Sequence, residues 1–164
     1  MHELHLLRHA KSSWDEPGLP DHERPLAPRG RKAAKKLARY LRDQEIRPDL
    51  VLCSSARRTR ETLERIRSSL GEPVVEIEDG LYGAGSDDLL ARLRGVPEGV
   101  GSALLIGHNP GLQDLALALA PSEPPLTARF PTGALASFAL AGPWAQLGEA
   151  QAELTAYVVP RELP

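Results

Sequence analysis

LLRHAKSSW, residues 6–14, carries an apolar run directly into a cationic pair, with no polar spacer between them. Leu6 and Leu7 end a predicted strand over residues 3–7, and Arg8 and His9 follow at once. A lysine and two serines come close behind, as Lys11, Ser12 and Ser13. In open α/β sheets, ligands bind beyond the carboxyl ends of the strands. The stretch therefore predicts an α/β sheet with a functional site at the end of its first strand.

The rest of the chain repeats this pattern of apolar strands and amphipathic helices. Helical spacing of alanine and leucine begins at Arg29 and ends before Pro48, and a further helix opens at Pro110. Alternation of strands and helices through residue 120 predicts an α/β fold: a three-layer sandwich with a mainly parallel central sheet flanked by helices. The other predicted helices cover residues 58–71 and 86–95, and the other predicted strands cover 50–53, 74–77, 103–106, 134–140 and 152–159.

Composition predicts an ordinary globular protein. The 164 residues are 41% hydrophobic and 26% charged, with a formal net charge of -2, and we expect one domain over residues 1–164. This charge argues against general binding to nucleic acid or to a membrane surface. No apolar run approaches the ~20 residues of a membrane span, and the first residues are too few and too charged for a signal peptide. We therefore expect a cytoplasmic protein, and a monomer.

Neither cysteine nor histidine indicates a cofactor or a metal. Cys53 is the single cysteine, so no internal disulfide forms, and its place in an apolar strand favours a small core residue. The five histidines lack the spacing of metal ligands. We expect neither a metal nor another cofactor.

Polar residues follow three of the predicted strands. Arg8 and His9 follow the first, SSARR (residues 54–58) follows the second, and GHN (residues 107–109) follows the strand at 103–106. If these strands are parallel neighbours, two histidines and at least two arginines converge at one edge of the sheet. Adjacent guanidinium groups repel a metal ion, whereas their planar forks of donors suit phosphate oxygens. The pattern favours a site for phosphate or a similar anion.

Cleavage of a phosphoryl group needs a nucleophile, and His9 is the candidate. The chain has no P-loop, no Cys-x5-Arg motif and no carboxylate pair in the candidate site that would hold magnesium. A neutral imidazole can attack phosphorus, and flanking arginines favour the neutral ring while they stabilise charge on the phosphoryl oxygens. A pocket that binds phosphate without turnover is the alternative that these residues leave open.

Several motifs, in order along nearly the whole chain, resemble the histidine phosphatase superfamily, which includes the phosphoglycerate mutases. The closer likeness is to the small branch similar to the phosphohistidine phosphatase SixA. That resemblance implies a phosphoglycerate mutase-like fold, His9 as nucleophile, and a phosphate pocket of Arg8, Arg58 and His108. The motifs that carry it are RHAKS (residues 8–12), RPLAPRG (24–30), CSSARRTRETL (53–63), LLIGHNP (104–110) and TGALASFAL (132–140).

Four further residues are candidates for substrate binding: Lys11, Ser12, Arg24 and Asn109. Each of the first two can equally well stabilise the turn after His9. Arg24 can steer an acidic partner or form a structural ion pair. We expect Trp14, in the same loop, to pack beneath it rather than to contact a partner.

Two departures from the family pattern matter. Ser54 and Ser55 stand where the superfamily usually has Ser-Pro, and the two adjacent arginines leave the choice between Arg57 and Arg58 uncertain by one position; we align Arg58 with the phosphate-binding arginine. The resemblance also implies a glutamate general acid after the third strand, as in mutase-like members. Glu78, Asp79, Asp87 and Asp88 lie there, yet none matches that acid, and Asp15, Asp21 and Glu23 in the long loop are disfavoured substitutes.

The missing acid shapes the functional hypothesis. An alcohol leaving group needs strong protonation, whereas the imidazole of phosphohistidine needs less help. The sequence therefore favours a metal-independent phosphatase that hydrolyses phosphohistidine on a signalling or phosphocarrier protein, through a covalent phosphohistidine intermediate. Its partner would be a phosphorylated protein such as a histidine phosphotransfer domain. A phosphatase for a small phosphoester and a non-catalytic phosphate-recognition module are the alternatives.

Overall fold

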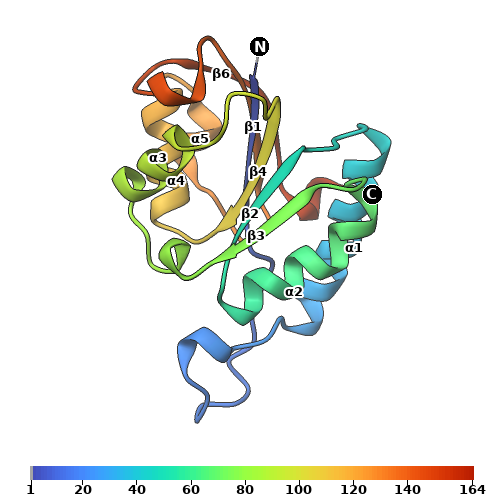
Figure 1. The fold of residues 1–164 in the computed structure, drawn as a ribbon. Coiled ribbons are helices and arrows are strands. Elements are labelled where there is room, and N and C mark those ends of the chain that lie inside the picture. The colour runs from blue at the N-terminus through green and yellow to red at the C-terminus, as the bar shows by residue number, and fades with distance from the viewer. Residues whose placement is uncertain (1) are drawn as a thin grey trace.

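The computed structural model describes residues 2–164 and contains one six-stranded sheet of order β3-β2-β4-β1-β5-β6 (Figure 1). Strands β3, β2, β4 and β1 are mutually parallel, whereas β5 runs antiparallel to both β1 and β6. The predicted mainly parallel sheet is confirmed. The strands are β1 (His2–Arg8), β2 (Leu50–Ser54), β3 (Val74–Glu78), β4 (Ser102–Gly107), β5 (Leu135–Leu140) and β6 (Ala152–Val158).

Helices cover both faces of this sheet, as the three-layer prediction requires. In Figure 1, α1 and α2 lie on one side of the strands, and α3, α4 and α5 lie on the other. The helices are α1 (Pro28–Asp43), α2 (Arg57–Ile66), α3 (Ser86–Arg94), α4 (Gly111–Leu119) and α5 (Pro124–Ala128). The 3-10 turns are η1 (Asp21–Glu23), η2 (Arg67–Ser69), η3 (Asp79–Leu81), η4 (Trp144–Gln146) and η5 (Pro160–Glu162).

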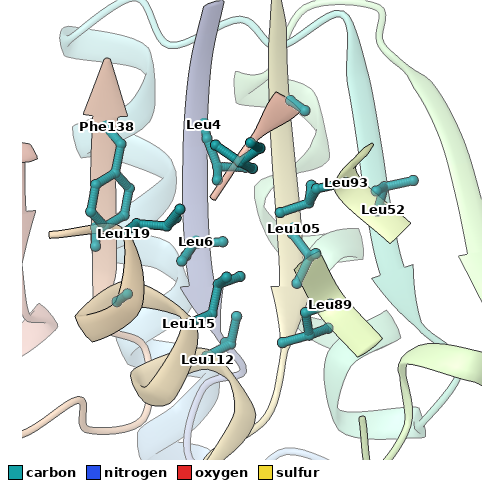
Figure 2. Packing of buried hydrophobic residues seen from close by; sticks show 14 of the residues in the cluster. Leu4, Leu6, Leu52, Leu89, Leu93, Leu105, Leu112, Leu115, Leu119 and Phe138 are labelled. Atoms are coloured by element: carbon teal, nitrogen blue, oxygen red, sulfur yellow. The ribbon is translucent and has the colours of Figure 1, made fainter. Parts of the chain in front are cut away.

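The central strands are apolar on both faces because each face packs against helices. In β1, Leu4 and Leu6 join the core under α3 and α4, while Leu7 joins the core under α1 and α2. Figure 2 shows Leu4 and Leu6 beside Leu112, Leu115 and Leu119 of α4 in the first of these cores. This alternation fixes the register of the strand, since a slip of one residue would exchange the two faces.

The pairing of β1, β4 and β2 aligns their carboxyl ends. Arg8 pairs with Gly107, and Ile106 pairs with both Leu7 and Cys53. The residues that follow these three strands therefore emerge side by side, as the sequence predicted.

The long proline-rich loop after β1 is held back onto the sheet edge by hydrogen bonds. Ser12 forms an isolated bridge with Leu26, and the Ala27 amide donates to the Lys11 carbonyl at 2.9 Å. The Leu26 amide donates to the Glu61 carboxylate of α2 at 2.9 Å. Between these anchors, η1 projects beyond the ends of the strands (Figure 1).

No helix within residues 2–164 is long and apolar enough to cross a lipid bilayer.

Candidate active site

Four of the predicted residues meet at the carboxyl edge of the parallel strands. Arg8 ends β1 and His9 follows it, His108 follows β4, and Arg58 lies in the first turn of α2. The rings of His9 and His108 lie 5.3 Å apart, centroid to centroid. Arg8 and Arg58 are close enough that each lowers the pKa of His9. The predicted convergence of two histidines and two arginines is therefore present.

The imidazole of His9 is locked in one orientation. Its side chain is buried, and Nδ1 lies 2.7 Å from the Ala10 carbonyl oxygen. Because a carbonyl can only accept, Nδ1 carries the proton in this contact and Nε2 keeps its lone pair. The next residue is fixed as well, since the Ala10 amide donates to Thr62 Oγ1 at 3.0 Å and that hydroxyl donates to the Arg58 carbonyl.

Both histidines are held in their neutral form. Burial, together with the positive charges of Arg58 and Arg8, lowers the pKa of His9 to about 3. Burial, followed by Arg58, lowers the pKa of His108 to about 4. A neutral ring is the form in which an imidazole nitrogen can act as a nucleophile.

Arg58, and not its neighbour, belongs to the cluster. Its side chain is 9% exposed, and its guanidinium donates to Asp21, to the backbone carbonyl at 2.8 Å and to the carboxylate at 3.0 Å. The side chain of Arg57 is 43% exposed and pairs with Glu61 one helical turn on, at 2.8 Å. The geometry thus agrees with the alignment that places Arg58 in the phosphate pocket.

Arg8 and His108 each present a buried nitrogen without a partner among the described residues. Arg8 donates through Nη1 to the Phe130 carbonyl at 3.1 Å, while its buried Nε bonds to nothing within residues 2–164. His108 Nε2 lies 2.8 Å from Ser54 Oγ, and its buried Nδ1 likewise has no partner there. Burying such a group without a hydrogen bond is unfavourable, which makes both atoms candidates for ligand contacts.

Two further residues, Asp21 and Tyr82, complete the site, and sequence reasoning had missed Tyr82 altogether. Asp21 of η1 receives hydrogen bonds from the Tyr82 hydroxyl at 2.6 Å and from Arg58. These hydrogen bonds, that from Tyr82 first, lower the pKa of Asp21. The Tyr82 ring also packs edge-on against His108 at 5.6 Å. Asp21 had been disfavoured as an acid, and nothing in the sequence around Tyr82 indicated that it reaches the site.

Arg24 and Ser12 organise the long loop. The Arg24 guanidinium donates to the Ser13 carbonyl, to the Asp21 carboxylate and to the Ser12 hydroxyl. It also stacks on the ring of Trp14 at 3.3 Å from the centroid. The expectation that Trp14 packs beneath the loop is wrong: its side chain lies on the surface, 70% exposed, because Arg24 covers only one of its faces.

Lys11 and Asn109, also predicted to bind substrate, point elsewhere in this structure. The side-chain amide of Asn109 donates to the Phe130 carbonyl at 2.8 Å, and its oxygen accepts from the Gln113 amide, so it secures the start of α4. Lys11 is exposed and lines a separate cavity on the α1 side of the molecule.

Glu78, the last residue of β3, is engaged outside the cluster. Glu78 receives hydrogen bonds from Arg92, the shortest at 2.7 Å, so it serves a structural ion pair. Within residues 2–164, no group of three or more His, Cys, Asp or Glu side chains is arranged to hold a metal ion.

Comparison with known proteins points to one family. Residues 4–82 match the family model of the histidine phosphatase superfamily, branch 1. The phosphohistidine phosphatase SixA of Escherichia coli K12 is 32% identical, with 84% of this chain and 85% of that protein aligned.

Comparison with solved structures points to the same family. A candidate phosphohistidine phosphatase SixA from Nakamurella multipartita superposes with a TM-score of 0.86 at 33% identity, covering 97% of this chain and 96% of the other. The protein histidine phosphatase SixA complexed with tungstate gives a TM-score of 0.82 at 27% identity, covering 97% of each chain. With the histidine and arginine cluster at its sheet edge, the chain belongs to the histidine phosphatase superfamily.

Proposed function

We propose that this chain is a phosphatase that removes the phosphoryl group from phosphohistidine on a protein, through a phosphorylated His9. The observation that carries the proposal is the state of His9. Its ring is buried and neutral, Nδ1 is tied to the Ala10 carbonyl, and Nε2 makes no hydrogen bond within the described residues. A lone pair is thus held ready beside two guanidinium groups.

In the first step, His9 Nε2 attacks the phosphorus atom of the substrate. The bond from phosphorus to the substrate nitrogen breaks as the new phosphorus–Nε2 bond forms. A phosphohistidine that carries a proton on its other ring nitrogen leaves as neutral imidazole, so no protein acid is required. In the second step, water attacks phosphorus, the bond to Nε2 breaks and phosphate leaves. Nε2 regains its lone pair, and the water proton leaves with the product or with solvent.

The arginines would stabilise the charge on the transferred group. The phosphoryl oxygens carry most of the negative charge in the transition state, and preorganised donors aimed at them lower the barrier. Arg8 Nε is a buried donor with no partner in residues 2–164, and Arg58 is near enough that its charge lowers the pKa of Arg8. Arg58 now contacts Asp21, so binding of phosphate would exchange a carboxylate for phosphoryl oxygens at the same guanidinium.

His108 would act as a neutral donor. Ser54 Oγ accepts a hydrogen bond from the Ala56 amide. The hydroxyl proton of Ser54 is then available for donation to His108 Nε2, which lies in contact with this oxygen. Donation by Ser54 leaves the proton of the neutral ring on Nδ1, the nitrogen that lacks a partner. His108 Nδ1 can then donate to a phosphoryl oxygen without adding a positive charge.

The named relatives support the choice of substrate. The Escherichia coli relative is a phosphohistidine phosphatase, and a protein histidine phosphatase of this fold binds tungstate, a tetrahedral anion like phosphate. The metal-free chemistry of the proposal fits the donor set, because guanidinium and neutral imidazole groups surround the reacting atoms. A phosphatase for small phosphoesters is the second candidate, favoured by the exposed Asp21 and Tyr82 pair, which could hold a proton for an alcohol leaving group.

Trapping the intermediate tests the proposal. We expect mass spectrometry at alkaline pH, where phosphohistidine is stable, to find a phosphoryl group on His9 after brief incubation with a phosphohistidine protein. His9→Ala should lack both the adduct and turnover while it keeps a folded circular dichroism spectrum. Comparing the rate on a phosphohistidine protein with the rates on a panel of small phosphoesters distinguishes the two candidate activities. If a phosphoester is hydrolysed much faster than the phosphohistidine protein, the proposed substrate is wrong. If the protein binds phosphate but forms no adduct and shows no turnover, it is a phosphate-recognition module and not an enzyme.

A further inference from the structure

A cavity of about 440 Å³ lies on the α1 side of the molecule, apart from the catalytic cluster. It is formed by the loop after His9, the first turns of α1, the segment that follows α5, and η5. None of Arg8, His9, Arg58 and His108 lines it. Its size is that of a small-molecule site, for which volumes of roughly 300–1,000 Å³ are usual.

The lining of this cavity is strongly cationic. Six basic side chains border it, and neither Asp nor Glu is among its lining residues in the described part of the chain. The ion pairs found within residues 2–164 include none of the six. Six of the 20 lysines and arginines thus gather at one hollow of a chain whose formal net charge is -2. The six are Lys11, Arg29, Lys32, Lys36, Arg129 and Arg161.

This arrangement works against the stability of α1. The N-terminal end of a helix carries partial positive charge, which favours acidic side chains there and disfavours basic ones. The first turn of α1 has no acidic residue, although Arg29 and Lys32 lie at that end. In α3, by contrast, Asp87 and Asp88 occupy the first turn. A bound anion would offset the repulsion between these basic side chains and the helix end.

We propose that this cavity is a second anion-binding site, which takes a small molecule carrying several phosphate groups. A concave site bordered by six cations suits the dense charge of an oligophosphate better than the flat face of a protein. Part of its wall is apolar, from Pro131, Val159 and Pro160, which gives room for an organic group attached to the phosphates. The inference does not depend on the proposed catalysis, because no residue of the catalytic cluster takes part.

Charge reversal on α1 tests this site. Lys32→Glu/Lys36→Glu changes two lining residues, and Lys35→Glu/Arg39→Glu changes two basic residues of the same helix that do not line the cavity. Both variants are made in an Arg58→Ala background, so that binding at the catalytic cluster is weakened alike. Isothermal titration with inorganic tripolyphosphate at constant ionic strength should give at least tenfold weaker binding for the lining variant than for its control. Equal affinities, or no saturable binding to the Arg58→Ala parent, would overturn the proposal.

Two further measurements distinguish the possible ligands and test the rival interpretation, a docking surface for the protein substrate. Tighter binding of ATP than of tripolyphosphate would assign the site to a nucleoside oligophosphate, and the reverse order to a free oligophosphate; either result supports the site. In the wild-type background, the lining variant is also assayed on a phosphohistidine protein. A loss of turnover with unchanged tripolyphosphate binding would make the cavity a docking surface for the protein substrate and would overturn the small-molecule site.

Discussion

His9 shows how much of one side chain's chemistry is set by its immediate partners. The residue is 6% exposed, the Nδ1 atom of its ring contacts the carbonyl of the next residue, and its pKa is lowered to about 3. Burial alone would also lower the reactivity of an imidazole by hiding it, but the carbonyl contact directs Nε2 away from the backbone. The proposed nucleophile is therefore positioned by main-chain atoms, which the sequence pattern cannot specify in detail.

Arg57 and Arg58 are adjacent in the chain yet have opposite environments. Arg58 is buried beside the two histidines, while Arg57 pairs with Glu61 at the surface. We expect Arg58→Ala to lower kcat/KM by about 10²–10³-fold, the usual effect of removing one donor that stabilises charge in a transition state. Arg57→Ala should stay within a few-fold of wild type. Steady-state kinetics on a phosphohistidine protein measures both, and a larger loss for Arg57→Ala would reverse the assignment.

Sequence reasoning identified the site residues that follow strands. It missed those whose contacts depend on the conformation of a loop. His9, His108 and the two arginines follow apolar strands, so their meeting point could be inferred from the parallel sheet alone. Asn109 could not be judged in this way, because the carbonyl that its amide contacts belongs to Phe130, 21 residues away. Asp21 and Tyr82, 61 residues apart, meet because the long loop after β1 brings η1 next to the residues that follow β3.

Among the elements, the strands were easier to predict than the ends of helices. Every strand was predicted within one or two residues, because the apolar runs are short and bounded by polar residues or glycine. The helix predicted over residues 58–71 ends at Ile66 and continues as η2, so its last turn was misassigned. Helix α5 was not predicted, since two prolines open its five residues and leave too short a pattern to read.

The contact between α1 and the loop after His9 depends on one glycine. Gly30 packs so tightly on the backbone of Lys11 that a Cβ at this position would overlap the Lys11 carbonyl. Gly30→Ala must therefore move either α1 or the loop that follows His9, the proposed nucleophile. We expect it to lower kcat/KM by at least tenfold and to reduce the free energy of unfolding by about 1–3 kcal/mol, as overpacking commonly does.

Gly99→Ala is the matched control for this change. Gly99 lies in a surface turn, and a Cβ there would meet nothing within 4 Å. Kinetics and urea unfolding of both variants separate a local clash from a general effect of replacing glycine. If Gly30→Ala retains wild-type activity, the loop can yield without moving His9, and the packing contact does not position the nucleophile.

The molecule concentrates its chemistry through topology and charge. Three parallel strands end together, and the chain places its histidines and arginines at those ends while it remains acidic in total. The carboxylates near the site are bound to arginines: Asp21 to Arg58, and Glu61 to Arg57. Net charge alone would therefore predict a poor partner for anions, whereas the order of residues along the strands predicts an anion site at the sheet edge.

Burying neutral histidines makes the stability of the fold depend on pH. The pKa values of His5, His9 and His108 are all lowered, chiefly by burial, to about 3 for His9 and about 4 for His108. In the unfolded chain these rings titrate near pH 6.5. Between that pH and the lowered values, the unfolded state binds protons that the folded state does not. Stability is therefore full above about pH 6.5 and falls as the pH drops, by up to about 1.4 kcal/mol per pH unit for each ring.

Urea unfolding between pH 6 and pH 5 isolates the histidines, because the carboxylates with lowered pKa values, such as Asp21 and Glu78, change protonation below this window. We expect the free energy of unfolding of the wild type to fall as the pH is lowered from 6 to 5. The free energy of unfolding of the His9→Ala/His108→Ala variant should fall distinctly less steeply. If both proteins lose stability at the same rate, the two rings are not buried in their neutral form. The nucleophile would then lack the lone pair on which the proposed chemistry depends.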